Sequence, residues 1–149
     1  MEDTLVARRN GSSFTSRAAR RRVAYDARTV SFDLAVWEGP LPISDAAALA
    51  LFKRLSAEHV GSPPFAPPTE KIRSFLADIT KIYPEARDLP YERFDEAVWS
   101  DGPLINNAGG PFFYFGIVWT RAKEVAPVVA RIAAKHGLVC FDPQSGRRV

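Results

Sequence analysis

The sequence predicts an α+β fold of the ferredoxin-like type, a βαββαβ two-layer sandwich with one extra helix after the first. Short apolar segments have the length and composition of strands, at 31–37, 112–119 and 138–142. Other segments repeat apolar residues at helical spacing, at 45–60, 70–83 and 121–136. Their order is strand, helix, helix, short strand, strand, helix, strand. We expect residues 30–149 to form one domain.

The first strand, VSFDLAVWEG at 30–39, alternates in the manner of a half-buried strand. Its side chains divide into one set that faces the helices and one set that faces away: Phe32, Leu34 and Val36, against Asp33, Ala35 and Trp37. Gly39 ends the strand. Ser44 is placed to cap the helix that follows, with Asp45 in its first turn.

A proline-rich connector separates this helix from the next one. GSPPFAPP at 61–68 holds four prolines, which remove backbone donors and fix φ, so it is neither helix nor central strand. Thr69 is expected to cap the second helix. That helix has a clean amphipathic pattern and ends at Pro84.

The second half of the chain supplies the remaining strands. Residues 85–98 predict a loop with a short helical turn, and turn signals follow over 99–110, with room for a short strand at 103–106. Thr120 is expected to cap the third helix, in which Pro127 predicts a kink, and Gly137 is placed to end it. The predicted topology pairs the strands at 31–37 and 112–119 in parallel at the centre. It puts the strands at 103–106 and 138–142 on the edges and packs every helix on one face.

The strand at 112–119 is apolar on both faces, which raises the question of what covers the second one. Gly116 favours a close helix approach on its own side. We therefore assign three aromatic residues of this strand to the open face beside Trp37: Phe113, Phe115 and Trp119. Either the loop at 85–98 covers them, or they form an interface with a second copy, another protein or an apolar small ligand. The polar residues near the strand ends are Asp33, Glu38, Asp101, Asp142 and Gln144.

Charge is distributed unevenly along the chain. Of the 20 basic and 17 acidic residues, seven Arg and three acidic residues lie within 1–30, which leaves 13 basic and 14 acidic residues in the body. A body of net charge −1 lacks the field of a phosphate-backbone binder. The basic residue that an RNA-recognition strand needs before Gly116 is also missing. Nucleic acid is therefore not an expected partner.

Residues 1–29 are expected to be a disordered basic tail. They fit an extension without a role, a flexible arm for acidic partners, or a targeting peptide. The chain has no run of 18 apolar residues, so no membrane span is expected. Its single cysteine, Cys140, excludes an internal disulfide and fits a cytoplasmic location.

Motifs for catalysis, metals and cofactors are not found in the sequence. His59 and His136 lie on different predicted helices, and Cys140 is expected to be a buried structural residue. A phosphate-binding loop and a G-x-S-x-G segment are both missing. Four carboxylates are candidates to converge at one end of the sheet and divide acid and base roles: Asp33, Glu38, Asp101 and Asp142. We expect a non-enzymatic protein without a cofactor or metal.

The segments WSDGPL, HGLVCFDPQSG, FDLAVWEG and YFGIVWT resemble a family of small, mostly uncharacterised bacterial proteins over residues 31–146. That family is in turn similar to immunity proteins of toxin systems. The resemblance implies a cytoplasmic protein that occludes a toxin. The aromatic face would supply burial, and Asp33, Glu38 and Asp101 would supply charge toward a basic partner. The alternative is a dimeric ferredoxin-like domain that binds a small ligand or acts as an enzyme.

Overall fold

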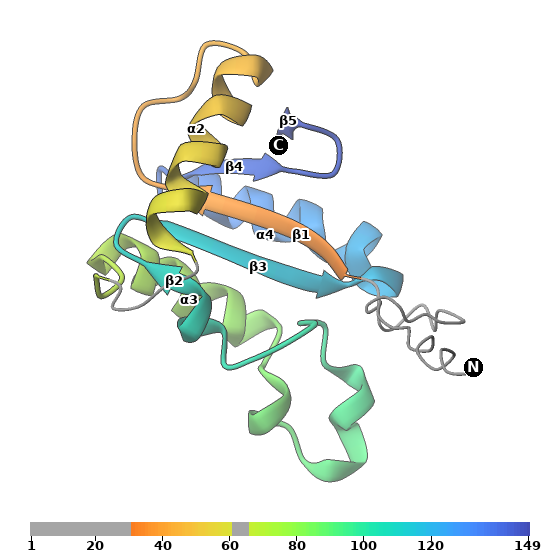
Figure 1. Ribbon diagram of the computed structural model, residues 1–149. Coiled ribbons are helices and arrows are strands. Elements are labelled where there is room, and N and C mark those ends of the chain that lie inside the picture. Colours follow the sequence, from red (N-terminus) through yellow and green to blue (C-terminus); the bar gives the residue numbers. More distant parts are fainter. Residues whose placement is uncertain (1–30, 61–65) are drawn as a thin grey trace, which may run out of the picture.

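The computed structural model describes residues 31–60 and 66–149 (Figure 1). The predictions for the tail at 1–29 and for the first part of the connector, 61–65, lie outside these residues. The described chain is α+β and contains an open antiparallel sheet in the order β2-β3-β1-β4-β5. The strands are β1 (Ser31–Trp37), β2 (Ala108–Gly109), β3 (Phe112–Val118), β4 (Val139–Asp142) and β5 (Arg147–Arg148). The α-helices are α2 (Asp45–His59), α3 (Glu70–Ile82) and α4 (Ala122–Lys135).

The two central strands, β1 and β3, pair antiparallel over their whole length, from Ser31↔Val118 to Trp37↔Phe112. The predicted parallel pairing is therefore wrong. The reason is that the start of β3 lies beside the end of β1. Glu38, which follows β1, donates its N–H to the carbonyl of Pro111, which precedes β3, at 3.0 Å. The chain thus enters β3 at that end of the sheet and must run back along β1. β4 also pairs antiparallel with β1, on its other side.

Helices cover both faces of the sheet, so the prediction that all of them pack on one face is wrong. α3 and α4 pack on the face that carries Leu34, Val36, Phe113 and Phe115. α2 packs on the opposite face and crosses in front of the strands in Figure 1. Under α2 lies a second core cluster, whose buried members are Ala35, Trp37, Ala48, Leu55, Phe112, Val139 and Phe141.

This arrangement answers the question of the second face. α2 covers it, and the loop at 85–98 does not. Phe113 and Phe115 point toward α3 and α4, while Trp37 is fully buried under α2 on the other side. Trp119 lies beyond β3 and is 47% exposed. The predicted exposed aromatic surface is therefore wrong, because its members lie on different faces and three of the four are buried.

The helix caps show how the sequence sets the helix starts. Ser44 and Thr69 accept hydrogen bonds from backbone N–H groups of α2 and α3, as predicted. Thr120 does not cap α4. It lies in a 3₁₀ turn, Trp119–Arg121, which leads into that helix. Gly137 has a φ of 71°, the left-handed conformation that favours glycine after a helix.

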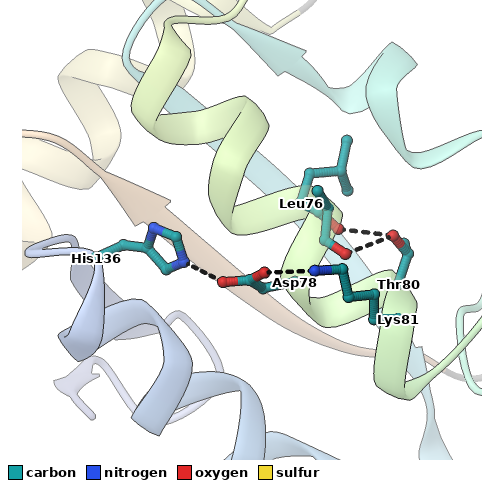
Figure 2. Close-up of polar contacts among 6 residues, drawn as sticks. Leu76, Asp78, Thr80, Lys81 and His136 are labelled. Atoms are coloured by element: carbon teal, nitrogen blue, oxygen red, sulfur yellow. Dashed lines mark hydrogen bonds and ion pairs between the residues drawn. The ribbon is translucent and has the colours of Figure 1, made fainter.

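The far end of α4 is joined to α3 by a polar contact. His136, which follows α4, lies with Nε2 2.7 Å from Oδ2 of Asp78 on α3 (Figure 2). The His136 ring also packs edge-on against Phe75. This contact joins the two helices on their shared face of the sheet.

Short elements fill the region between α3 and β3. Residues 86–88 and 91–96 form 3₁₀ turns, in agreement with the predicted loop with a helical turn. The predicted strand at 103–106 is wrong, because residues 104–107 form another 3₁₀ turn. The edge strand of the β2–β3 hairpin lies at Ala108–Gly109 instead. β5, which the sequence analysis did not predict, continues the sheet beyond β4.

Candidate ligand-binding cleft

α2 leaves one end of its face of the sheet uncovered by described residues, and a cleft of about 340 Å³ opens there. The cleft lies between the start of β1, the second half of β3, the end of α2 and residues 100–107. Most of the residues that line it have polar side chains. The side chains that line it and carry polar groups include Ser31, Asp33, His59, Ser100, Asp101 and Tyr114. We call this the polar cleft.

Gly116 forms part of the floor of the polar cleft. A larger residue has no room at this position. A Cβ at this position would lie 2.2 Å from Oγ of Ser100 and 3.1 Å from Oδ1 of Asp33. The β1–β3 register places Asp33 directly opposite Gly116. The glycine therefore lets a serine from the loop and an aspartate from the neighbouring strand meet above the sheet.

Asp33 is held in place by two hydroxyl donors. Ser31 Oγ donates to Asp33 Oδ1 at 2.7 Å, and the Tyr114 phenol donates to Oδ2 at 2.8 Å. Burial and the hydrogen bond to Asp33 raise the pKa of Tyr114 to about 12. The phenol is therefore protonated at neutral pH and acts as a hydrogen-bond donor. The carboxylate is fixed before any ligand arrives.

The backbone of Asp33 is held from the other side by the turn between β4 and β5. The side-chain amide of Gln144 donates to the Asp33 carbonyl at 2.9 Å and accepts from the Asp33 N–H at 2.6 Å. Asp142 in turn accepts hydrogen bonds from the Gln144 backbone and side chain. Gln144 thus extends the pairing of β1 beyond the end of β4 and anchors the strand residue that carries the carboxylate.

The loop wall of the cleft is anchored to β3 and to the residues after α3. The Ser100 N–H donates to the Gly116 carbonyl at 2.9 Å, so residues 98–100 run along the outer edge of β3. The indole N–H of Trp99 donates to the Tyr83 carbonyl at 2.7 Å. Further along, the Leu104 N–H donates to the buried carboxylate of Glu85 at 2.9 Å. The Trp99 indole and the Ser100 N–H thus anchor the loop that begins at residue 99.

Asp101 and His59 are the other ionisable side chains that line the polar cleft. Asp101 is exposed, and the Asn107 amide contacts its carboxylate only at 3.4–3.5 Å, which leaves the carboxylate free to accept stronger bonds. His59 ends α2, stacks on Phe112 and has an 18% exposed side chain. Both residues can contact a ligand without first breaking a strong internal hydrogen bond.

The predicted acidic residues meet only in part. Asp33 and Asp101 both line the polar cleft, in agreement with the expected convergence. Glu38 lies at the opposite end of β1, where it accepts a hydrogen bond from the Thr69 hydroxyl. Asp142 caps the turn after β4 and reaches Asp33 only through Gln144. The expected convergence of all four carboxylates is therefore wrong.

The cleft residues that the sequence analysis did not single out include Ser31, Tyr114 and Ser100. Tyr114 had a usable signal, since it is the single residue of β3 with a polar group and it shares a face with Gly116. The approach to Gly116 was expected from a helix, but Ser100 of the loop makes it. Ser31 had no signal of its own, because its role depends on Asp33.

Within residues 31–60 and 66–149, no three His, Cys, Asp or Glu side chains are grouped closely enough to hold a metal ion. None of the described helices has the length and apolar character needed to cross a bilayer. Comparisons with protein-family models, curated proteins and solved structures found no match. The resemblance to small bacterial proteins and to immunity proteins stays a prediction.

Proposed function

We propose that the protein binds a small organic ligand in the polar cleft, and that the ligand carries a cationic amine or a comparable hydrogen-bond donor. The observation that carries the proposal is the Asp33 carboxylate, which Ser31 and Tyr114 hold in place over Gly116. A carboxylate held in this way needs no rearrangement when a donor arrives, and such preorganisation favours binding.

The charge of the cleft supports a cationic ligand group. Among the described residues that line it, Asp33 and Asp101 are acidic, Lys and Arg are missing, and His59 is the one basic side chain. The remaining polar side chains are hydroxyls and amides, which suit the hydroxyl groups of a ligand. A cavity of about 340 Å³ is in the range of small-molecule sites.

The protein-binding function expected from the sequence depended on an exposed aromatic surface. Trp37, Phe113 and Phe115 are buried, so they do not form such a surface.

We also propose that β1–β4 with α3 and α4 form a ferredoxin-like unit to which α2 and β5 are added. The strand order β2-β3-β1-β4 and the position of both helices on one face support this assignment.

The proposal is tested with three probes of equal size in an ¹H–¹⁵N NMR titration of the full chain: butylamine, butanol and butanoate. Butylamine is expected to bind best and to shift the amide signals of Asp33, Tyr114 and Gly116. Asp33→Asn and Asp101→Asn should each weaken butylamine binding about tenfold, which corresponds to roughly 1.4 kcal/mol. Asp88→Asn, which lies in the turn at 86–88 away from the cleft, is the matched control. Equal binding of butylamine and butanoate, or no shift at these amides, contradicts the proposal.

A further inference from the structure

A second and larger cavity adjoins the polar cleft. It has a volume of about 620 Å³ and lies between residues 85–87, residues 94–103 and the end of β3. Its surface is mainly apolar, and the side chains that supply this character include Ala86, Phe94, Ala97, Trp99, Pro103 and Val118. We call this the apolar groove. Nothing in the proposed function uses it.

Ser100 and Asp101 line both cavities. The polar cleft and the apolar groove therefore lie on the two sides of one short segment of chain. Both residues are exposed, so a molecule can pass over them from one cavity into the other. The Trp99 indole and the Ser100 N–H hold this segment on either side, through the Tyr83 and Gly116 carbonyls.

The charges of the apolar groove also favour a cation at its edge. Its two arginines already have acidic partners: Arg121 contacts Glu124 at 3.0 Å, and Arg87 lies 3.9 Å from Glu85. The exposed carboxylate of Asp101 stands at the boundary with the polar cleft. An amine at this boundary meets Asp101 and Asp33, and an apolar body attached to it meets Phe94 and Trp99.

From this arrangement we infer that the ligand is an amphipathic amine, with its cationic head in the polar cleft and an aromatic body in the apolar groove. The inference rests on the proposed function, since it takes the head group from it. It adds the chemical class of the rest of the molecule. A ligand of this kind buries apolar surface that the head group alone cannot bury.

The test is an ¹H–¹⁵N NMR titration of the full chain with phenylalkylamines of two to six methylene groups, each compared with the alkylamine of the same chain length. At its best chain length the phenylalkylamine is expected to bind at least tenfold more tightly than its alkylamine. It should shift amides at Tyr114 and Gly116 and also at 94–97. The matching phenylalkanoates should bind more weakly than the amines.

Two exposed aromatic residues provide a matched pair of variants. Phe94 lines the groove and is 55% exposed, whereas Tyr91 is 88% exposed and does not line it. Phe94→Ala should reduce the advantage of the phenyl group to less than threefold and leave alkylamine binding unchanged. Tyr91→Ala should change neither.

The outcomes separate the inference from the proposed function. Alkylamine binding in the polar cleft without any gain from the phenyl group overturns the amphipathic ligand alone. If phenylalkylamines bind with shifts confined to 94–97, the ligand does not occupy both cavities, and the inference is overturned. If the alkylamines also fail to bind, the proposed function is overturned too. A gain that survives in Phe94→Ala also overturns the inference.

Discussion

His136 Nε2 lies 2.7 Å from Asp78 Oδ2, so one side-chain contact joins the end of α4 to the middle of α3 (Figure 2). Lys81 adds a longer ion pair to the other carboxylate oxygen, at 3.7 Å. The hydrogen bond from His136 is the main cause that holds the pKa of Asp78 below its ordinary value of 3.8. A lowered folded-state pKa means that the unfolded chain binds this proton more readily.

The first prediction concerns how the free energy of unfolding changes at acidic pH. Asp78 makes its full contribution to the free energy of unfolding above about pH 4, its pKa in the unfolded chain. This contribution is lost as the pH falls through the lower pKa that Asp78 has in the folded protein. Asp78→Asn should therefore lower the free energy of unfolding at neutral pH. The difference from the wild type should shrink as the pH falls below about 4.

Urea unfolding at a series of pH values measures this difference. Lys81→Gln is the control, because its more distant and 77% exposed ammonium should contribute much less. A difference between wild type and Asp78→Asn that stays constant with pH contradicts the prediction.

The second prediction uses the contact between Tyr114 and Asp33. Burial, more than the hydrogen bond to Asp33, raises the pKa of Tyr114 to about 12. The folded state thus holds this proton more tightly than the unfolded chain, in which tyrosine has a pKa of about 10. The resulting stabilisation is fully present below about pH 10 and is lost as the pH rises toward 12.

Ultraviolet absorbance titration of the wild type minus Tyr114→Phe isolates this phenol from the other tyrosines. In Asp33→Asn the pKa of Tyr114 should fall but stay above about 10, because burial, its larger cause, remains. A return to the ordinary value in Asp33→Asn would show that the hydrogen bond is the larger cause and would contradict the structure.

The third prediction concerns Trp37, the largest side chain under α2. Its ring is fully buried, stacks on Phe112 and packs against Phe141, but among the described residues its Nε1 has no hydrogen-bond partner. An unpaired buried donor costs about 1–3 kcal/mol. Trp37→Phe removes that donor and leaves a cavity, so the two effects oppose each other. We expect a loss of at most ~1.5 kcal/mol, against about 3–5 kcal/mol for Trp37→Ala.

Chemical denaturation measures both variants. Trp119→Phe is the exposed control and should change the free energy of unfolding by no more than about 0.5 kcal/mol. If Trp37→Phe costs as much as Trp37→Ala, the indole N–H must have a partner that the described residues do not supply.

The sequence was most informative where one local rule decides the structure. The apolar spacing predicted the bounds of α3 closely, and Ser44, Thr69 and Gly137 marked helix ends as expected. Thr120 had the same chemistry as Thr69, yet the chain forms a 3₁₀ turn there. Cap residues thus predict helix ends only where no other turn competes with them.

The face of β3 was not predictable by the same reasoning. Alternation identifies the buried side of a strand only when the other side meets water. β3 is covered on both sides, so its two sets of side chains, Phe113 with Phe115 and Phe112 with Tyr114, are equally apolar candidates for either face. Asp33 and Tyr114 could have identified the face. A hydrogen-bonded polar pair on one face of a sheet indicates that a helix does not cover that face completely.

The convergence of Asp33 and Asp101 was predicted from their positions near strand ends, and the structure brings both to one cleft. Glu38 does not join them, because it follows the last residue of β1, whereas Asp33 lies near the first. Strand direction and length therefore decide which end residues meet. The antiparallel pairing of β1 and β3, which the sequence analysis reversed, decides which residues of β3 join them.

The last prediction concerns the close approach of Ser100 to Gly116. A Cβ at Gly116 would overlap with Oγ of Ser100 and would lie 3.1 Å from Oδ1 of Asp33 and from Cβ of Ser31. Gly116→Ala should therefore displace the Ser100 hydroxyl and lower the free energy of unfolding by about 1–3 kcal/mol, the usual cost of overpacking. Ser100→Ala alone should cost little, because the backbone hydrogen bond from Ser100 to the Gly116 carbonyl remains.

A double-mutant cycle measures the coupling of these two positions. If the hydroxyl is the main obstacle, Gly116→Ala combined with Ser100→Ala should recover more than half of the stability that Gly116→Ala loses, since the nearest atom is gone. Additive losses would place the strain at Asp33 and Ser31 instead. In that case Gly116→Ala should also shift the titration of Tyr114, because the phenol and the added methyl group would compete for the position of the same carboxylate.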